Sequence, residues 1–137
     1  NEYFRRFNQS VKLLLPIAFV GTVFLCLLNQ PVLGLYGHDY LSDKSAYYIA
    51  MSALPVFVLA NLYKINMVVR EHQILMVIVS VVSSALLIIV LYLCLNNGID
   101  AVQSYFWGQW AQILCILAFV MVRYKKDKNE LIRNIDQ

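Results

Sequence analysis

The chain has 137 residues, of which 61% are hydrophobic and 14% charged, and its formal net charge is +3. Soluble domains are about 45–50% apolar and about 25% charged, so this composition excludes an ordinary water-soluble domain. A chain of this composition is expected to lie in a lipid bilayer, and no nucleic-acid partner is expected.

Four long stretches of the chain contain no Asp, Glu, Lys or Arg. A helix that rises about 1.5 Å per residue needs about 20 apolar residues to cross a hydrocarbon core about 30 Å thick. Lipid offers no partner to free backbone groups, so such continuous segments must span as helices. The uncharged stretches are residues 13–37, 45–63, 73–99 and 101–122.

We therefore predict an all-α integral membrane protein with four transmembrane helices and a basic cytoplasmic tail over 123–137. The whole chain, 1–137, is expected to form one membrane domain, in which short loops join the helices as an up-and-down bundle. The predicted spans are about 13–36, 45–66, 73–95 and 101–122.

Three prolines punctuate the spans. Pro31 lies near the end of the first span and Pro16 in its first turns, whereas Pro55 lies in the middle of the second span. A proline inside a helix removes a backbone donor, so a kink is predicted at Pro55. That kink could be static and absorbed by packing, or it could be a bend that shifts as the protein changes conformation.

The distribution of cations predicts the orientation. With an even number of crossings, the two termini and the 64–72 loop lie on one side, and this side carries ten of the eleven Lys and Arg residues. The positive-inside rule places that side in the cytoplasm, which makes the chain a multi-pass protein of the cell (cytoplasmic) membrane. The ten are Arg5, Arg6, Lys12, Lys64, Arg70, Arg123, Lys125, Lys126, Lys128 and Arg133.

No pattern in the sequence predicts an enzyme, a cofactor or a metal site. There is no Gly-rich phosphate loop, no HExxH and no pair of carboxylates, and His38 and His72 lie at opposite ends of the predicted spans. The three cysteines lie inside apolar runs without CxxC or Cys/His spacing, so we interpret them as small hydrophobic residues.

Polar residues on one helix face give the candidate substrate cavity. Tyr105, Gly108, Gln109 and Gln112 are spaced i, i+3, i+4 and i+7 in the fourth span, so they share a face. This face could serve helix packing, because small and polar residues promote close contact between helices. It could instead line a water-filled cavity for a polar head group, and Asn61 could belong to the same lining.

A second candidate is the 64–72 loop, KINMVVREH. This loop could be a charged segment that fixes the topology of the chain. It could instead contact anionic lipid head groups or a pyrophosphate at the cytoplasmic surface. In the second case Lys64 and Arg70 are the residues expected to make that contact.

The order of these features resembles the C-terminal part of bacterial polysaccharide flippases, the O-antigen and teichuronic-acid type exporters. They belong to the superfamily of multidrug, oligosaccharidyl-lipid and polysaccharide exporters. The resemblance runs over about residues 3–126, through LLLPIAFVGTVF, VLGLYGHDYLSDKSAYYIAMSALPVF and NNGIDAV. Its motif residues are Leu35, Tyr36, Gly37 and Tyr40 with Ala46 and Pro55, then Gly98, Ile99 and Ala101.

The resemblance implies the last four helices of a transporter with twelve or more. It implies alternating-access export of a polyprenyl-pyrophosphate-linked oligosaccharide, with the N-terminal helices of the same chain as partners. The start at Asn1, within an aromatic and cationic stretch, likewise suggests part of a longer polypeptide. Two alternatives remain: a small four-helix accessory subunit in envelope glycan synthesis, or a multidrug antiporter of the same superfamily.

Overall fold

The computed structural model describes residues 2–36, 44–69 and 72–135, and within these ranges all regular structure is helical. Four stretches are long and apolar enough to cross a membrane, the number that the sequence predicted: Glu2–Leu27, Lys44–Val69, Gln73–Asn96 and Ala101–Leu131. The first differs from its predicted bounds of about 13–36, because the aromatic and cationic stretch before residue 13 is helical and the helix is interrupted at Leu28. The helices are α1 (Glu2–Leu27), α2 (Asn29–Tyr36), α3 (Lys44–Ser52), α4 (Leu54–Val69), α5 (Gln73–Asn96) and α6 (Ala101–Ile135).

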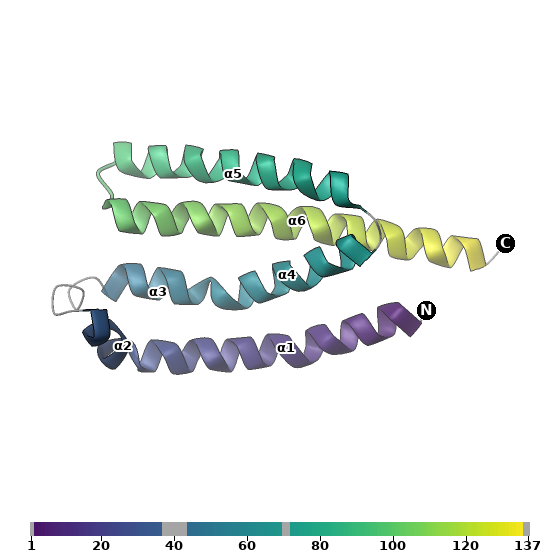
Figure 1. Cartoon of the computed structure of the whole chain (residues 1–137), viewed down its shortest axis with the longest axis horizontal. Helices are drawn as coiled ribbons and strands as arrows, with labels where there is room; N and C mark the ends of the chain where they lie inside the picture. Colours follow the sequence, from purple (N-terminus) through teal and green to yellow (C-terminus); the bar gives the residue numbers. More distant parts are fainter. Residues whose placement is uncertain (1, 37–43, 70–71, 136–137) are drawn as a thin grey trace.

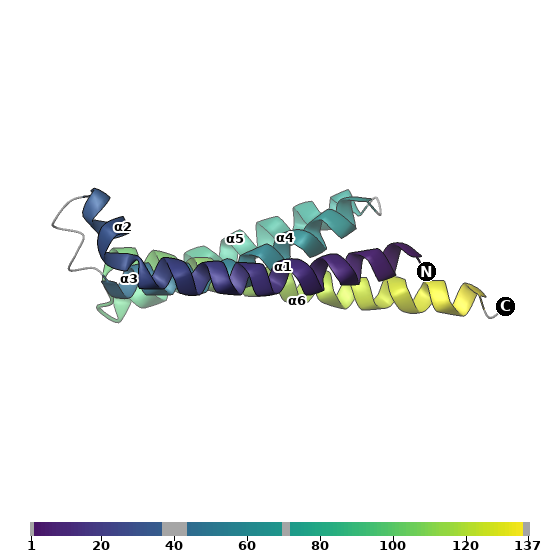
Figure 2. The ribbon, with the colours of Figure 1, turned by 90° about the horizontal axis from the view of Figure 1, so that it is seen from below.

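Two helix breaks occur just before prolines. The first span is interrupted at Leu28, three residues before Pro31, and α2 turns away from the line of α1 (Figure 2). The second span is interrupted at Ala53, where α3 ends and α4 begins with Pro55 in its first turn. The break predicted at Pro55 is therefore confirmed. Pro16, by contrast, lies inside α1, which continues on both sides of it.

The turn between α5 and α6 is built from its own sequence, NNGID. Gly98 has φ of +76°, a left-handed conformation that a residue with a Cβ rarely adopts, and it closes the C-terminus of α5. Asp100 then caps α6, because its carboxylate accepts from the backbone N–H of Val102 at 2.9 Å. This short turn forces α5 and α6 to run antiparallel as neighbours.

The four spans run up and down, as the sequence predicted. Their order in Figure 1 is α5, α6, α3 with α4, and α1, from top to bottom. We call the end of the molecule that holds both termini, the end of α4 and the start of α5 the basic end. Consecutive spans need not be neighbours, because packing rather than loop length decides which faces meet.

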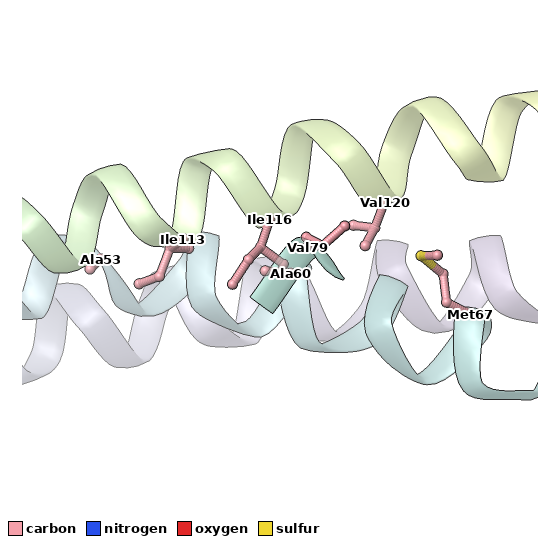
Figure 3. Close-up of a cluster of buried hydrophobic side chains, with 7 residues drawn as sticks. All are labelled: Ala53, Ala60, Met67, Val79, Ile113, Ile116 and Val120. Atoms are coloured by element: carbon pink, nitrogen blue, oxygen red, sulfur yellow. The ribbon is translucent and has the colours of Figure 1, made fainter. Parts of the chain in front are cut away.

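The packing that sets this order involves small residues. Gly108 of α6 lies so close to α5 that an added Cβ would be 3.0 Å from the carbonyl oxygen of Leu87. On its other side, α6 packs Ile113, Ile116 and Val120 toward Ala53, Ala60 and Met67, and Val79 of α5 completes this cluster (Figure 3). Small residues on facing helices let the backbones approach closely. As a result α6 packs against α5 on one side and against α3 and α4 on the other.

The basic tail is helical. α6 continues through Ile135, well beyond the predicted end of its span at 122. Ion pairs one turn apart support this extension: Arg123 with Asp127 at 3.0 Å and Lys126 with Glu130 at 3.9 Å. The tail is thus a direct continuation of α6.

Candidate functional site

A pocket lies where α3 meets α4, at the break before Pro55. Its volume is about 260 Å³, and it opens between the broken span and α6. The break contributes the small side chains of Ala50 and Ala53 to its lining, and α6 contributes the polar side chains of Tyr105 and Gln109. The residues that line the pocket are Ala50, Ala53, Leu54, Phe57, Tyr105, Phe106, Gln109 and Ile113.

The broken backbone at this pocket is held by hydrogen bonds to α6 and within α3. The N–H of Ala53 bonds to Ala50 at 3.2 Å, three residues back, which leaves the carbonyl of Ile49 without the N–H that a regular helix would supply. The indole N–H of Trp110 donates to this carbonyl at 3.0 Å, and the hydroxyl of Ser52 donates to it at 2.8 Å. Trp110 therefore ties α6 to the break.

Two of the predicted cavity residues meet in this pocket. Tyr105 and Gln109 both line it, and Nε2 of Gln109 donates to the hydroxyl oxygen of Tyr105 at 2.9 Å. Tyr105 is exposed and Gln109 is half-buried. An amide offers two N–H donors and a carbonyl oxygen with two lone pairs, so most of the hydrogen-bonding capacity of Gln109 remains for water or a ligand.

Gln112 lies on the same side of α6 but is directed toward α5. Its Nε2 donates to the hydroxyl of Ser84 at 3.2 Å, and it is not among the residues that line the pocket at Pro55. Ser84 and Ser80 instead line a shallow groove along α5, whereas Ser83 is fully buried and donates to the carbonyl of Ser80. Gln109 therefore faces the pocket beside α3 and α4, whereas Gln112 faces α5.

The remaining predicted residues are not gathered at the pocket. The Nδ2 of Asn61 donates to the carbonyl oxygen of Phe57 within its own helix, at 3.0 Å, and Asn61 does not line the pocket. Lys64 is half-buried near the end of α4, and no hydrogen bond or ion pair joins it to another described residue. Arg70 falls outside the described residues. Among those that are described, no three His, Cys, Asp or Glu side chains could hold a metal ion.

At the basic end, sequence reasoning missed a cluster of aromatic and amide side chains that joins α1, α4 and α6. The ring of Tyr124 lies 5.1–5.3 Å from the rings of Phe4, Phe7 and Tyr63. Its hydroxyl donates to Oδ1 of Asn8 at 2.9 Å. The i, i+3 spacing of Phe4 and Phe7 is a helical signal, but the sequence does not reveal their partners.

Within this cluster, Asn66 of α4 is fully buried. Its Oδ1 accepts from the hydroxyl of Tyr3 in α1 at 2.8 Å, whereas its Nδ2 has no partner in the described part of the chain. His72, Arg123 and Asp127 form a further polar group nearby, between the start of α5 and α6. The i, i+4 spacing of Arg123 and Asp127 was its one visible sign in the sequence.

Comparison of the chain with protein-family models, curated proteins and solved structures gives no match.

Proposed function

We propose that this chain is the C-terminal segment of a transporter that flips lipid-linked oligosaccharide across the cytoplasmic membrane by alternating access. The observation that carries the proposal is the strip of Tyr105, Gln109 and Gln112 on α6. It lies within a helix apolar enough to cross a membrane, yet both glutamines remain partly accessible. The sequence resemblance to polysaccharide flippases supports the same reading.

The energetics of the amides favour a hydrated surface over lipid. Each glutamine has one internal partner, Tyr105 for Gln109 and Ser84 for Gln112. A polar group that loses its hydrogen bonds in an apolar surrounding costs about 1–3 kcal/mol. The remaining amide positions suit water and sugar hydroxyls, which both donate and accept. In this reading the glycan passes along the strip while the lipid tail stays in the bilayer.

The basic end would then face the cytoplasm. Ten of the eleven Lys and Arg residues lie on that side of the spans, and the positive-inside rule favours it. Lys64 of α4 and Arg70, which follows α4 in the sequence, would contact the anionic pyrophosphate before the glycan enters the cavity. Lys64 suits this role because its side chain is only partly buried near the end of α4.

Other helices would complete the cavity wall. In α1 the buried side chains are Phe4 and Thr22, and in α5 they are Val79 and Ser83, so each helix exposes most of its length. Open faces of this kind are free to meet lipid or the N-terminal helices of the same polypeptide. We assign those helices the rest of the cavity wall.

A paired substitution tests the proposal. In the complete transporter, Gln109→Leu with Gln112→Leu is expected to lower surface-glycan export about tenfold at unchanged protein level, since each lost ligand hydrogen bond is worth about 0.5–1.5 kcal/mol. The control is Gln103→Leu, which removes an amide from the same helix, one bonded to Ser45 at the opposite end from the basic end. Full export by the double variant would exclude the polar strip from the transport path.

A further inference from the structure

The pocket at the break before Pro55 has aromatic rings from both of the spans that form it. Phe57 comes from α4, near its start, where the N–H of Phe57 donates to the carbonyl of Ala53 at 2.8 Å. Tyr105 and Phe106 come from α6. Their rings stand at 66° to each other with the centroids 5.7 Å apart, so they do not cover each other's faces as stacked rings do. Ring faces are therefore available to a ligand in the pocket.

The polar groups of the pocket lie side by side and retain hydrogen-bonding capacity. Gln109 uses one of its two N–H groups to donate to the hydroxyl oxygen of Tyr105, at 2.9 Å. The hydroxyl proton of Tyr105, the second N–H of Gln109 and its carbonyl oxygen make no hydrogen bond to the described residues. Two donors and an acceptor thus lie within about one turn of α6.

The pocket is uncharged and lies toward the end of the spans opposite the basic end. None of the described residues that line it carries a charge. Tyr105 and Gln109 follow the start of α6 at Ala101 by four and eight residues. At about 1.5 Å per residue, these separations are about 6 and 12 Å. The pocket is therefore within reach of a ligand from the aqueous side at that end.

We propose that this pocket is a subsite for one uncharged pyranose ring of the glycan, an inference that rests on the proposed function. A pyranose carries C–H groups on its ring faces and hydroxyl groups around its rim. The slightly positive C–H groups pack on the negatively polarised face of an aromatic ring, which Phe57 and Phe106 supply. The hydroxyl groups both donate and accept, so they pair with the free positions of Tyr105 and Gln109.

The size of the pocket and its lack of charge narrow the ligand class. Its volume of about 260 Å³ lies just below the range of about 300–1,000 Å³ that is usual for drug-sized ligands, so it holds one ring rather than a repeat unit. A uronate ring would bring a carboxylate into a site without a cation, which is strongly disfavoured. A lipid acyl chain would leave the free polar groups of Tyr105 and Gln109 unpaired. The subsite therefore selects neutral sugars.

Saturation-transfer NMR on the chain in nanodiscs tests this selectivity. The probes are methyl β-glucopyranoside, the corresponding methyl uronide, and the amide of that uronide, which has nearly the same shape but no charge. The glucoside and the amide are expected to bind saturably in the millimolar range, as suits one ring with few contacts. The uronide is expected to bind about tenfold more weakly or less at neutral pH. Equal binding of the uronide would overturn the proposal, and so would binding of the glucoside no greater than that to empty nanodiscs.

Substitutions then locate the binding. Phe57→Leu and Gln109→Leu are each expected to weaken binding of the glucoside about three- to tenfold. The matched control is Trp107→Leu, which removes an exposed aromatic ring from α6 outside this pocket and should bind as the wild type does. Circular dichroism of each variant checks that the helices are intact. Wild-type affinity in Phe57→Leu and Gln109→Leu would place sugar binding elsewhere and refute the subsite.

The subsite and the proposed function can fail separately, because sugar binding by the chain does not depend on export. Suppose that the chain binds no sugar while replacement of both glutamines still lowers export. The subsite is then wrong and the transport path remains. If the chain binds neutral sugar in the pocket while the double variant exports fully, the subsite remains and the transport path along the strip is excluded.

Discussion

The indole N–H of Trp110 donates to the carbonyl oxygen of Ile49 across 3.0 Å, at the point where the second span is broken. That carbonyl has lost its helical donor because Ala53 bonds one residue closer, to Ala50. The tryptophan thus compensates for a local defect that the following proline imposes. It also holds the pocket wall formed by α3 against α6.

Trp110→Phe is expected to lower the free energy of unfolding by about 0.5–1.5 kcal/mol, the net worth of one hydrogen bond. The measurement is urea unfolding of the chain in bicelles. Trp107→Phe is the matched control, because Trp107 is 46% exposed and belongs to the same helix. Equal losses in both variants would show that the bond to Ile49 adds no stability.

Gly108→Ala is expected to separate α5 from α6. The added Cβ would lie 3.0 Å from the carbonyl oxygen and 3.2 Å from Cγ of Leu87, and overpacking of this kind costs about 1–3 kcal/mol. Gly21→Ala is the control, since nothing lies within 4 Å of a Cβ built there and alanine favours a helix. Loss of stability should appear in the first variant alone; a stable Gly108→Ala would contradict the close approach.

The Tyr3 and Asn66 pair is expected to show strong non-additivity. Tyr3→Phe alone leaves both polar atoms of the buried Asn66 amide without a described partner and should cost about 1–3 kcal/mol. Adding Asn66→Leu removes the unsatisfied amide, so the double variant should regain most of that loss. A double-mutant cycle by urea unfolding measures the coupling. Simple addition of the two costs would mean that the amide is satisfied by other means.

The orientation is tested by cysteine labelling in a chain whose three cysteines are replaced by alanine. A membrane-impermeant maleimide added outside intact cells should label Asn97→Cys, in the α5–α6 turn, and should spare Lys128→Cys until the cells are opened. Both positions are exposed, so accessibility within the protein does not decide the result. Labelling of Lys128→Cys in intact cells would reverse the assignment.

The sequence was sufficient for the number of spans and for an irregularity of the second span near Pro55, because charge-free length and a missing backbone donor act locally. It misplaced the first span, which begins at residue 2 and ends at 27. It also placed Tyr105 and Gln109 on one face, where the structure finds them hydrogen-bonded. It could not give the order of the helices, which depends on the packing of Ala53, Ala60 and Met67 of the second span against α6. Nor could it show that Asp127 is buried, since a carboxylate in a basic tail reads as solvated.

The sequence predicted only part of the candidate cavity, because it does not show which side chains of different helices meet. Helical spacing places Gln112 and Gln109 on one face but does not say which neighbouring helix each side chain meets. The structure directs Gln112 to Ser84 and leaves Asn61 bonded within its own helix. The hydrogen-bond partner of each side chain depends on its distance from the next helix, and no local sequence pattern predicts that distance.

α6 is long enough to connect the pocket with the basic end as one continuous helix. Its 35 residues measure about 52 Å at about 1.5 Å per residue, which is longer than a hydrocarbon core about 30 Å thick. Gln109 at the pocket and Arg123 beside His72 belong to this one unbroken helix, about 21 Å apart by the same rise. No break in the helix separates them, so a displacement at one of these positions would be transmitted to the other through continuous helix.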